Sequence, residues 1–445
     1  MQKLKHNIEE LISEARFFEI KSLLGKLNPA EVEELLNEIP EEQWIIVFRL
    51  LSKELAADVF SELEPDEQTK LLEEFRDYRV RDIIRELDPD DRTELFEELP
   101  AELVPKLTGH LTPSERREAI ELLGYPEDSV GREMTPEFVE LNQQWTVSQA
   151  LEHIRKTAPD KETIYTSYVL GTGRKLLGVL SLKDLIIAED DEIVSEIMNP
   201  HVITVQTTDD REIAAREMAK YDFIALPVVD NEMRLVGIIT VDDVIDVLRE
   251  EATEDIERMA AVAPIDRPYL STSIWEIVRR RAPWLAALLI LEGFTTNVMS
   301  HYEEFIAGML ILTFFVPTLV SVGGNAGAQI SALIIRGMSI GELSKKDIWK
   351  IVGREAITGL IIAIILGILL SLRVLLVEPR WDIALAVGIA LTIVVWYSNM
   401  IGALLPMMAK KIGVDPAVMA GPMVTTIVDV TGIAMYFAIV KLILP

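Results

Sequence analysis

A single carboxylate lies deep in the apolar C-terminal part of the chain. Asp429 belongs to the segment Gly421–Gly432, which reads GPMVTTIVDVTG, and from Asp429 to Leu444 the only other charged residue is Lys441. A carboxylate at mid-bilayer depth costs roughly 2.5–3.5 kcal/mol to insert, so it usually faces a pore, a water-filled cavity or a partner. Because a cation that crosses a membrane needs oxygen ligands, we interpret Asp429 as an ion-pathway residue.

Acidic residues also crowd a stretch in the middle of the chain that reads as a helix. Asp243, Asp246 and Glu250 are three and four residues apart, so neighbouring carboxylates share one helix face. Like charges placed in this way repel one another unless a cation neutralises them. Mg²⁺ suits such a surface, since it keeps several waters and binds through one or two carboxylates at a time. A face that is simply solvated is the alternative interpretation.

The composition excludes several other kinds of chemistry. The 445 residues include no cysteine, and the five histidines lack the i,i+4 spacing of a zinc helix. No nucleophile–base pair or phosphate-binding loop is found, so we do not expect an enzyme. The net charge of −29 argues against nucleic-acid binding, which requires a basic surface.

The negative charge is concentrated in the first part of the chain. From Ser271 onward there are 13 Lys and Arg against 11 Asp and Glu, which leaves 30 against 61 in residues 1–270. The segment Met1–Leu27 carries charges throughout and has no apolar core of a signal peptide. We therefore expect the acidic first part to stay in the cytoplasm.

Five apolar stretches after Pro283 are each long enough to cross a bilayer. They cover residues 283–299, 305–335, 351–376, 383–409 and 416–444. Basic residues precede the first stretch, fill the loop after the second and follow the fourth, at Arg279–Arg281, Arg336–Arg354 and Lys410–Lys411. The positive-inside rule then places the N-terminal part in the cytoplasm and the C-terminus outside the cell membrane.

Residues 1–128 read as an array of short helices. The pattern Leu-x-Pro-x-acid occurs four times, with prolines at Pro29, Pro65, Pro89 and Pro113. Proline fits the first helical position, and an acid three residues after a capping residue suits a capping box. The repeat predicts a small helical array, which is a scaffold more often than an active site.

A second repeat occupies residues 130–250. Glu133–Pro136 (EMTP) recurs as Glu196–Pro200 (EIMNP), and Leu177–Asp184 (LGVLSLKD) recurs as Val236–Asp243 (VGIITVDD). Each copy reads as a short strand, a helix, two strands and a closing helix. The pair resembles tandem CBS domains over about 120 residues.

The resemblance to CBS pairs implies a candidate site for an adenine nucleotide such as ATP. A hydroxyl and a carboxylate lie at matching offsets in the two copies, and the residues concerned are Ser181, Asp184, Phe223, Thr240 and Asp243. Plain helix N-capping by the same residues is an equally good interpretation.

The whole chain resembles the MgtE family of magnesium channels. The resemblance is carried by Phe315–Thr318 (FVPT), Gly323–Gln329 (GGNAGAQ) and Asp415–Pro422 (DPAVMAGP), which leads to Asp429. It implies a multidomain protein with an all-α helical-repeat N-domain, an α/β tandem CBS pair, a connecting helix and a polytopic membrane domain of five helices. The expected boundaries are 1–128 for the N-domain, 129–192 and 193–248 for the two CBS copies, 249–270 for the connecting helix and 271–445 for the membrane domain. The helical pattern of the connecting segment reaches Ala263, and we expect Pro264 and Pro268 to end the helix before Trp275.

The resemblance further implies a homodimer in the lipid bilayer that conducts Mg²⁺. Asp429 would face the central pore, with the backbone carbonyls of Thr425 and Gly421 contacting the waters of the ion. Asn325 and Gln329, in what we expect to be a glycine-rich break of the second apolar stretch, are further pore candidates, for which close helix packing is the alternative. Glu292, the second acid within a span, is explained as well by capping or pairing as by ion contact.

Regulation is also implied by the resemblance, with cytosolic Mg²⁺ closing the channel. The ion would bridge acids of the N-domain, of the second CBS copy and of the connecting helix. These residues are Asp88, Asp91, Asp210, Glu212, Asp222, Asp242, Asp243, Asp246, Glu251, Glu254 and Asp255. Asp243 is a candidate for both ribose and Mg²⁺, and we favour Mg²⁺. A CBS-regulated anion channel and a membrane sensor or adaptor that conducts nothing are the competing hypotheses.

Overall fold

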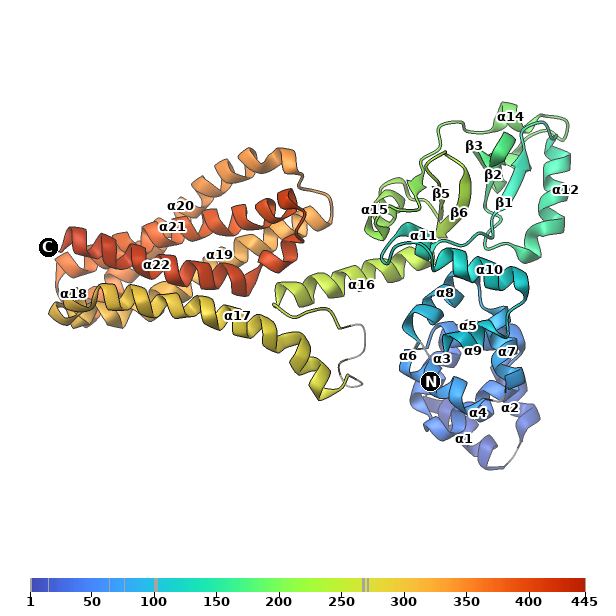
Figure 1. The fold of residues 1–445 in the computed structure, drawn as a ribbon, viewed down its shortest axis with the longest axis horizontal. Coiled ribbons are helices and arrows are strands. Elements are labelled where there is room, and N and C mark those ends of the chain that lie inside the picture. The colour runs from blue at the N-terminus through green and yellow to red at the C-terminus, as the bar shows by residue number, and fades with distance from the viewer. Residues whose placement is uncertain are drawn as a thin grey trace. The chain divides into compact units, whose positions relative to one another are not determined.

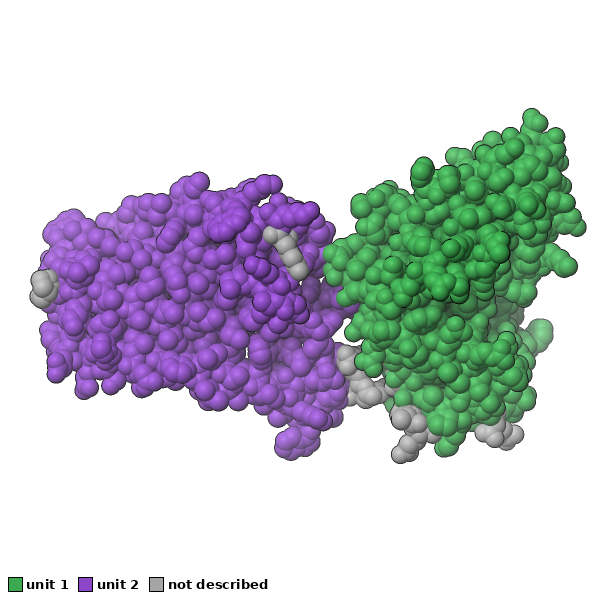
Figure 2. Space-filling model, turned by 45° about the horizontal axis from the view of Figure 1, so that its top comes forward, with its two compact units in different colours: residues 1–249 green, residues 250–445 purple. Residues whose placement is uncertain are grey.

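The computed structural model describes residues 2–14, 16–63, 65–75, 77–99, 103–265, 269 and 272–444. The chain folds as two compact units, residues 1–249 and 250–445, which are coloured separately in Figure 2. The N-terminal unit holds a helical array followed by two small mixed sheets, and the C-terminal unit is helical in its described part (Figure 1).

Short amphipathic helices build the first part of the N-terminal unit. They are α1 (Gln2–Ser13), α2 (Phe17–Leu24), α3 (Pro29–Glu38), α4 (Glu41–Leu50), α5 (Lys53–Ser61), α6 (Pro65–Glu74), α7 (Asp77–Glu86), α8 (Pro89–Glu98), α9 (Val104–Thr108) and α10 (Pro113–Leu122). Their apolar faces meet in one core that contains the fully buried Phe48, Phe60 and Ile83.

The proline pattern marks helix starts, as predicted. Helices α3, α6, α8 and α10 each begin at the proline of one Leu-x-Pro-x-acid motif. Asn28 with Glu31 and Thr112 with Glu115 form complete capping boxes. Asp88 holds the capping position of α8, but its side chain makes no capping hydrogen bond. Its carboxylate is therefore not used by the helix that it precedes.

The two repeat copies fold alike. The first contains α11 (Val130–Glu133), β1 (Val139–Asn142), α12 (Val147–Thr157), β2 (Thr166–Leu170), β3 (Leu176–Ser181) and α13 (Leu182–Ile187). The second contains α14 (Val194–Ile197), β4 (Val205–Gln206), α15 (Arg211–Tyr221), β5 (Ala225–Val229), β6 (Leu235–Thr240) and α16 (Val241–Met259). In each sheet the first strand runs parallel to the middle strand and the third runs antiparallel to it.

The sequence segments that are repeated in the two copies form contacts between the copies. Thr135 of the first copy exchanges backbone hydrogen bonds of 2.8 and 2.9 Å with Ile238 of the second copy. A Cβ atom on Gly237 would lie 2.7 Å from the sulfur of Met134, and one on Gly178 would lie 2.7 Å from the sulfur of Met198. The methionine of each copy therefore packs on the glycine of the other copy, which explains why both sequence segments occur twice.

Helix α16 runs without a break from the last strand of the second copy through the expected start of the connecting helix at residue 249. It ends at Met259, earlier than the sequence pattern suggested, because Ala261 adopts a left-handed conformation with φ of 58°. Pro268, which we also expected to limit this helix, lies outside the described residues.

Five helical segments in the described part of the C-terminal unit are long and apolar enough to cross a membrane, as predicted: Ile274–His301, Leu310–Ser339, Ile348–Val377, Trp381–Ile412 and Pro416–Ile443. They consist of α17 (Ile274–His301), the 3₁₀ turn η3 (Leu310–Phe315) with α19 (Val316–Ser339), α20 (Ile348–Val377), α21 (Trp381–Ile412), and η5 (Pro416–Met419) with α22 (Gly421–Ile443). The shorter α18 (Glu303–Gly308) and η4 (Lys345–Asp347) lie between them.

The second span departs from the expectation that its glycine-rich segment is a break. Helix α19 is continuous through Gly323–Gln329, and the helical path is interrupted earlier, at Met309. Small residues here permit close helix contact instead of unwinding the helix.

Candidate functional site

The predicted pore residues Gly421, Thr425 and Asp429 follow one another at four-residue spacing on α22, so they lie along one side of the helix. The Thr425 hydroxyl donates a hydrogen bond of 2.8 Å to the Gly421 carbonyl, which keeps a second lone pair for another donor. Asp429 is half-buried, and its Oδ1 is buried without a hydrogen-bond partner among the described residues. A buried carboxylate oxygen without a donor is costly, so this atom is suited to a hydrated cation.

Close helix contacts hold the pore helix in place. A Cβ atom on Gly324 of α19 would lie 2.8 Å from Thr425 Cγ2 and 3.6 Å from Asp429 Oδ1. One on Gly402 of α21 would lie 2.2 Å from the carbonyl oxygen of Gly327. Helix α19 therefore approaches α21 through backbone and α22 through side chains at the level of the candidate site.

The structure places the two polar pore candidates of α19 differently. Asn325 and Gln329 are exposed, whereas Gly324, just before Asn325, and Gly327, between the two amides, are buried against α21 and α22. The glycines thus account for the packing role that was the alternative for this segment. In the single chain the two amides line the open side of α19.

The end of α16 contacts the segment that leads into α22. Arg258 forms ion pairs with Glu254, one turn earlier, and with Asp415. Asp255 accepts a hydrogen bond of 3.0 Å from Ser339 at the end of α19. A Cβ atom on Gly421 would lie 3.3 Å from the Met259 carbonyl oxygen. Two of the predicted regulatory acids therefore take part in contacts at the end of α16, Glu254 with Arg258 and Asp255 with the end of α19.

Acids of α8 and α16 come together inside the N-terminal unit. Burial raises the pKa of Asp91 to about 7, with Asp88 and Asp243 adding to the shift. Burial also raises the pKa of Asp243 to about 6, against the opposing hydrogen bond from Thr240. Asp88 has a raised pKa for the same reason, with Asp242 contributing. The structure thus brings four of the predicted regulatory residues into one acidic group.

The same group contains carboxylates that the sequence did not indicate. The pKa of Glu162 is raised to about 8 by burial and by the surrounding aspartates, Asp88 first among them. Asp90 and Glu137 also have raised pKa values through burial, with Asp243 contributing to the first and Asp88 to the second. Asp90 lies next to Asp91 and two residues after Asp88, so its place in the sequence could have indicated that it belongs to the group. Glu162 lies in a loop of the first CBS copy, where no spacing pointed to it.

The other predicted regulatory acids are spread over separate places. Asp210 caps the start of α15 and accepts a hydrogen bond of 2.9 Å from the backbone N–H of Glu212. Asp222 ends the same helix in a left-handed conformation, about 18 Å from Asp210 at 1.5 Å per residue. Asp246 pairs with Arg249 and borders the acidic group, where it adds to the raised pKa of Asp243. Glu251 is half-buried on the part of α16 within the C-terminal unit.

Throughout the described residues, no group of three His, Asp or Glu side chains has the arrangement of a metal site. The acidic group accordingly lacks a preformed cage. It suits an ion such as Mg²⁺, which can keep its waters and be held by one or two carboxylates.

The candidate nucleotide residues act as helix caps in this structure. The Ser181 and Thr240 hydroxyls each donate a hydrogen bond of 2.6 Å to the carboxylate three residues later, Asp184 and Asp243. Phe223 stacks on Tyr221 with 5.5 Å between the ring centroids. The capping interpretation is therefore supported, and in both copies the hydroxyl stays paired with its carboxylate.

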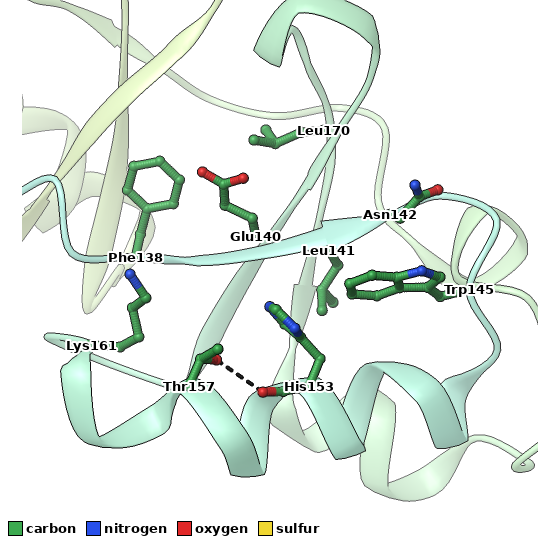
Figure 3. A pocket seen from close by; sticks show the side chains of 9 residues that line it. All are labelled: Phe138, Glu140, Leu141, Asn142, Trp145, His153, Thr157, Lys161 and Leu170. Carbon is green, nitrogen blue, oxygen red and sulfur yellow. Dashed lines mark hydrogen bonds between the residues drawn. The ribbon is translucent and has the colours of Figure 1, made fainter.

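An open pocket of about 420 Å³ lies elsewhere, on the first CBS copy (Figure 3). Trp145 and His153 face each other in it at 4.9 Å between ring centroids, and Glu140 pairs with Arg174 at 2.9 Å. Figure 3 shows its lining, which comes from β1, α12, the end of β2 and the loops beside them, namely Phe138, Glu140, Leu141, Asn142, Trp145, His153, Thr157, Lys161 and Leu170. The candidate nucleotide residues are not part of this lining.

Three family models match consecutive parts of the chain. The model described as a divalent cation transporter matches residues 316–439, the MgtE intracellular N domain matches 27–128, and the CBS domain matches 129–191 and 194–250. Together with the five membrane-spanning helices, these matches define a CBS-containing membrane transporter of divalent cations.

Characterised relatives are similar over the whole length. The chain is 38% identical over 450 residues to the magnesium transporter MgtE of Thermus thermophilus, covering 100% of this chain and 99% of that protein. It is 32% identical over 429 residues to the magnesium transporter MgtE of Bacillus subtilis, covering 96% and 95%. The chain belongs to the MgtE family of magnesium transporters.

Solved structures match the N-terminal unit. The cytosolic domain of the Mg²⁺ channel MgtE in complex with ATP aligns with a TM-score of 0.53 and 41% identity, covering 55% of this chain and 99% of that one. The soluble part of a magnesium transporter aligns with a TM-score of 0.54 and 33% identity, covering 57% and 99%. The predicted family and fold class are confirmed.

Proposed function

We propose that the chain forms a homodimeric, Mg²⁺-selective channel for magnesium uptake, closed by Mg²⁺ on the cytoplasmic side. The observation that supports permeation best is Asp429, whose buried Oδ1 has no hydrogen-bond partner among the described residues. Two copies of this carboxylate facing one pore would attract a largely hydrated cation, which suits an ion that loses water reluctantly. Thr425 and Gly421, on the same side of α22, contribute oxygens along the path.

Closure by cytosolic Mg²⁺ is supported by the acidic group of α8 and α16. Its carboxylates have raised pKa values because they are buried among like charges, as at Asp91 and Glu162. A divalent cation relieves this repulsion and so favours the form in which the acids are close. Moving a gate from 1:99 to 99:1 takes about 5.5 kcal/mol of differential binding, which calls for several weak sites acting together.

The remaining regulatory acids belong to the same proposal at other places. Asp210, Glu212 and Asp222 border α15, and Glu251, Glu254 and Asp255 lie on the far part of α16. Because the end of α16 touches the start of α22 through Asp415 and Gly421, ions bound along α16 act on the entrance of the pore. The proposed organisation has domains at 1–128, 129–192, 193–248, 249–270 and 271–445.

Apolar side chains exposed on the CBS pair support the proposed dimer. Ile186 and Ile187 of α13 are 67% and 71% exposed, and Ile245 and Leu248 of α16 are 53% and 43% exposed. Helices α13 and α16 are equivalent in the two copies, so both CBS copies present apolar surface from the same element. A second copy of the chain, related by a two-fold axis, would cover it with an identical surface.

Two further parts of the proposal concern nucleotide and orientation. A relative's cytosolic domain was solved with ATP, and we place an adenine nucleotide at Ser181, Asp184, Phe223 and Thr240. The basic residues Arg279–Arg281 and Lys410–Lys411 favour an N-terminal part in the cytoplasm and a C-terminus outside.

Mg²⁺ flux into liposomes that carry the full chain tests this function. Wild type is expected to conduct at low and to close at high Mg²⁺ on the cytoplasmic face. Asp429→Asn is expected to lower the flux by at least about tenfold, equivalent to about 1.4 kcal/mol. Asp382→Asn, which neutralises an exposed acid paired with Arg380 at the start of α21, is the matched control. A folded wild type that passes no Mg²⁺ would instead support the sensor or adaptor.

A further inference from the structure

Helix α17 packs through a single stripe. None of its residues is buried, and it packs chiefly against α22, as its course beside α22 in Figure 1 shows. The half-buried residues recur every three to four positions, at Trp284, Leu288, Glu292, Thr295 and Met299. This spacing is one face of an α-helix. A carboxylate therefore lies in the middle of the face that α17 turns toward its neighbours.

Glu292 and Asp429 face a common region from two helices. The Glu292 carboxylate is close enough to Asp429 for their charges to repel. Glu292 lies nine residues after Pro283, where the apolar part of α17 begins, and Asp429 lies eight residues after Gly421, where α22 begins. At 1.5 Å per residue, Asp429 lies about 12 Å after the start of α22, and Glu292 lies about 14 Å after Pro283 and about 27 Å after the start of α17.

The structural explanations for Glu292 do not fit its position. It lies 18 residues after the start of α17 and nine before its end, so it cannot cap either terminus. Across the described residues its side chain takes part in no ion pair or hydrogen bond. Thr295 Oγ1, one turn further on the same stripe, is buried without a hydrogen-bond partner, as is Asp429 Oδ1. The contact between α17 and α22 thus carries polar atoms that the described residues leave unsatisfied.

We infer that Glu292 is a second carboxylate of the ion pathway and binds a hydrated divalent cation together with Asp429. This inference rests on the permeation function proposed above. Two acids on neighbouring helices favour a doubly charged ion over a singly charged one, because the attraction of each negative charge is twice as large for Mg²⁺. Thr295 provides a hydroxyl for the waters of the ion.

Flux measurements on the full chain in liposomes test the role of the charge. Glu292→Gln keeps the shape and removes the charge, and it is expected to raise the half-saturating Mg²⁺ or lower the flux by about fivefold or more, roughly 1 kcal/mol. Glu292→Asp is expected to retain most of the flux. The control Glu304→Gln removes an exposed acid in the first turn of α18 and is expected to behave as wild type. Flux and half-saturation within about twofold of wild type in Glu292→Gln, a difference below roughly 0.5 kcal/mol, would overturn the inference.

The absence of cysteine allows a second measurement that does not depend on conduction. Glu292→Cys is expected to react with a charged, water-soluble thiol reagent, and Mg²⁺ is expected to slow the reaction. Leu289→Cys, on the exposed side of α17, is expected to show no Mg²⁺ dependence. Reaction at position 292 that Mg²⁺ leaves unchanged would also contradict the inference. If Asp429→Asn abolishes flux while both Glu292 tests give wild-type results, only this inference fails and the proposed channel stands.

Discussion

Arg258, one residue before the end of α16, forms an ion pair with Asp415, six residues before the start of the pore helix α22. The same guanidinium holds Glu254, so one cation links a predicted regulatory acid to the segment that positions Gly421. An ion pair thus connects the last turn of α16 to the segment that precedes α22.

Breaking this pair is expected to weaken closure of the channel. Arg258→Ala should raise the cytosolic Mg²⁺ needed for half-closure by about two- to fivefold, because a partly exposed ion pair contributes about 0.2–1 kcal/mol. The measurement is flux into liposomes against Mg²⁺ on the cytoplasmic face. The exchanged pair Arg258→Asp with Asp415→Arg should restore closure, and Arg174→Ala, which breaks an exposed pair in the first CBS copy, should have no effect.

The acidic group predicts how stability depends on pH. The pKa values of Asp243, Asp91 and Glu162 are raised to about 6, 7 and 8. A raised carboxyl pKa means that the folded form binds more protons than the unfolded one, so stability falls as pH rises through these values. Without Mg²⁺ the full chain should therefore lose thermal stability between about pH 4 and 8.

Adding Mg²⁺ should reverse this trend. The ion binds the ionised carboxylates, so its stabilising effect should grow from pH 6 to pH 8 over the range where Asp243, Asp91 and Glu162 lose their protons. Thermal unfolding of the cytosolic part within the full chain, followed with and without Mg²⁺, measures both effects. A Mg²⁺ effect that is the same at pH 6 and pH 8 would contradict the assignment of these carboxylates.

Glu162 provides a test of the acidic group that separates charge from packing. Glu162→Gln should raise the melting temperature without Mg²⁺, by roughly 2–4 °C for each kcal/mol of repulsion removed, and should reduce the added stabilisation by Mg²⁺. Glu152→Gln, on the exposed side of α12, is the control. A variant that is less stable in the absence of Mg²⁺ would show that Glu162 has a structural role instead.

Replacing Gly402 by alanine tests the close contact between α19 and α21. A methyl group there would lie 2.2 Å from a backbone oxygen, which only a shift of the helices can relieve. Gly402→Ala should destabilise the membrane unit by about 1–3 kcal/mol, measured by thermal unfolding in detergent. Gly353→Ala in α20, where an added methyl meets nothing within 4 Å, should be neutral or slightly stabilising.

The contribution of the first CBS copy to the proposed nucleotide site can be tested through Asp184. ATP at about 100 times its Kd should stabilise the protein by about 2.7 kcal/mol. Asp184→Asn keeps a capping side chain for α13 but removes the carboxylate, so it should lose the ATP effect while staying folded. Asp160→Asn, at an exposed position in the same copy, should keep it. Equal stabilisation of both variants would remove Asp184 from the nucleotide site.

Local signals in the sequence were sufficient for part of the fold. Helix starts at Pro29 and Pro113 follow from capping chemistry that involves only neighbouring residues. The five spans follow from length and apolar composition. The sequence showed Met134 and Gly237 only as parts of repeated segments, because their contact depends on how two distant segments pair.

The candidate sites were less accessible to sequence reasoning. Charge spacing indicated Asp243 and the family resemblance indicated Asp91, but Glu162 joins them through tertiary structure and has no local signal. The glycine-rich segment of α19 was expected to break and is helical, because Gly324 and Gly327 serve contact with other helices. A pattern of small residues does not by itself distinguish unwinding from close packing.

The sparse packing of α17 has a consequence for the synthesis of the protein. This helix is made first among the spans, and 119 residues separate its last residue, His301, from Gly421 at the start of α22, its chief neighbour. During that interval the Glu292 side chain enters the bilayer at a cost of roughly 2.5–3.5 kcal/mol without its final surroundings. A nascent chain interrupted before α22 therefore leaves the Glu292 carboxylate in the membrane without the helix that it faces in the complete protein.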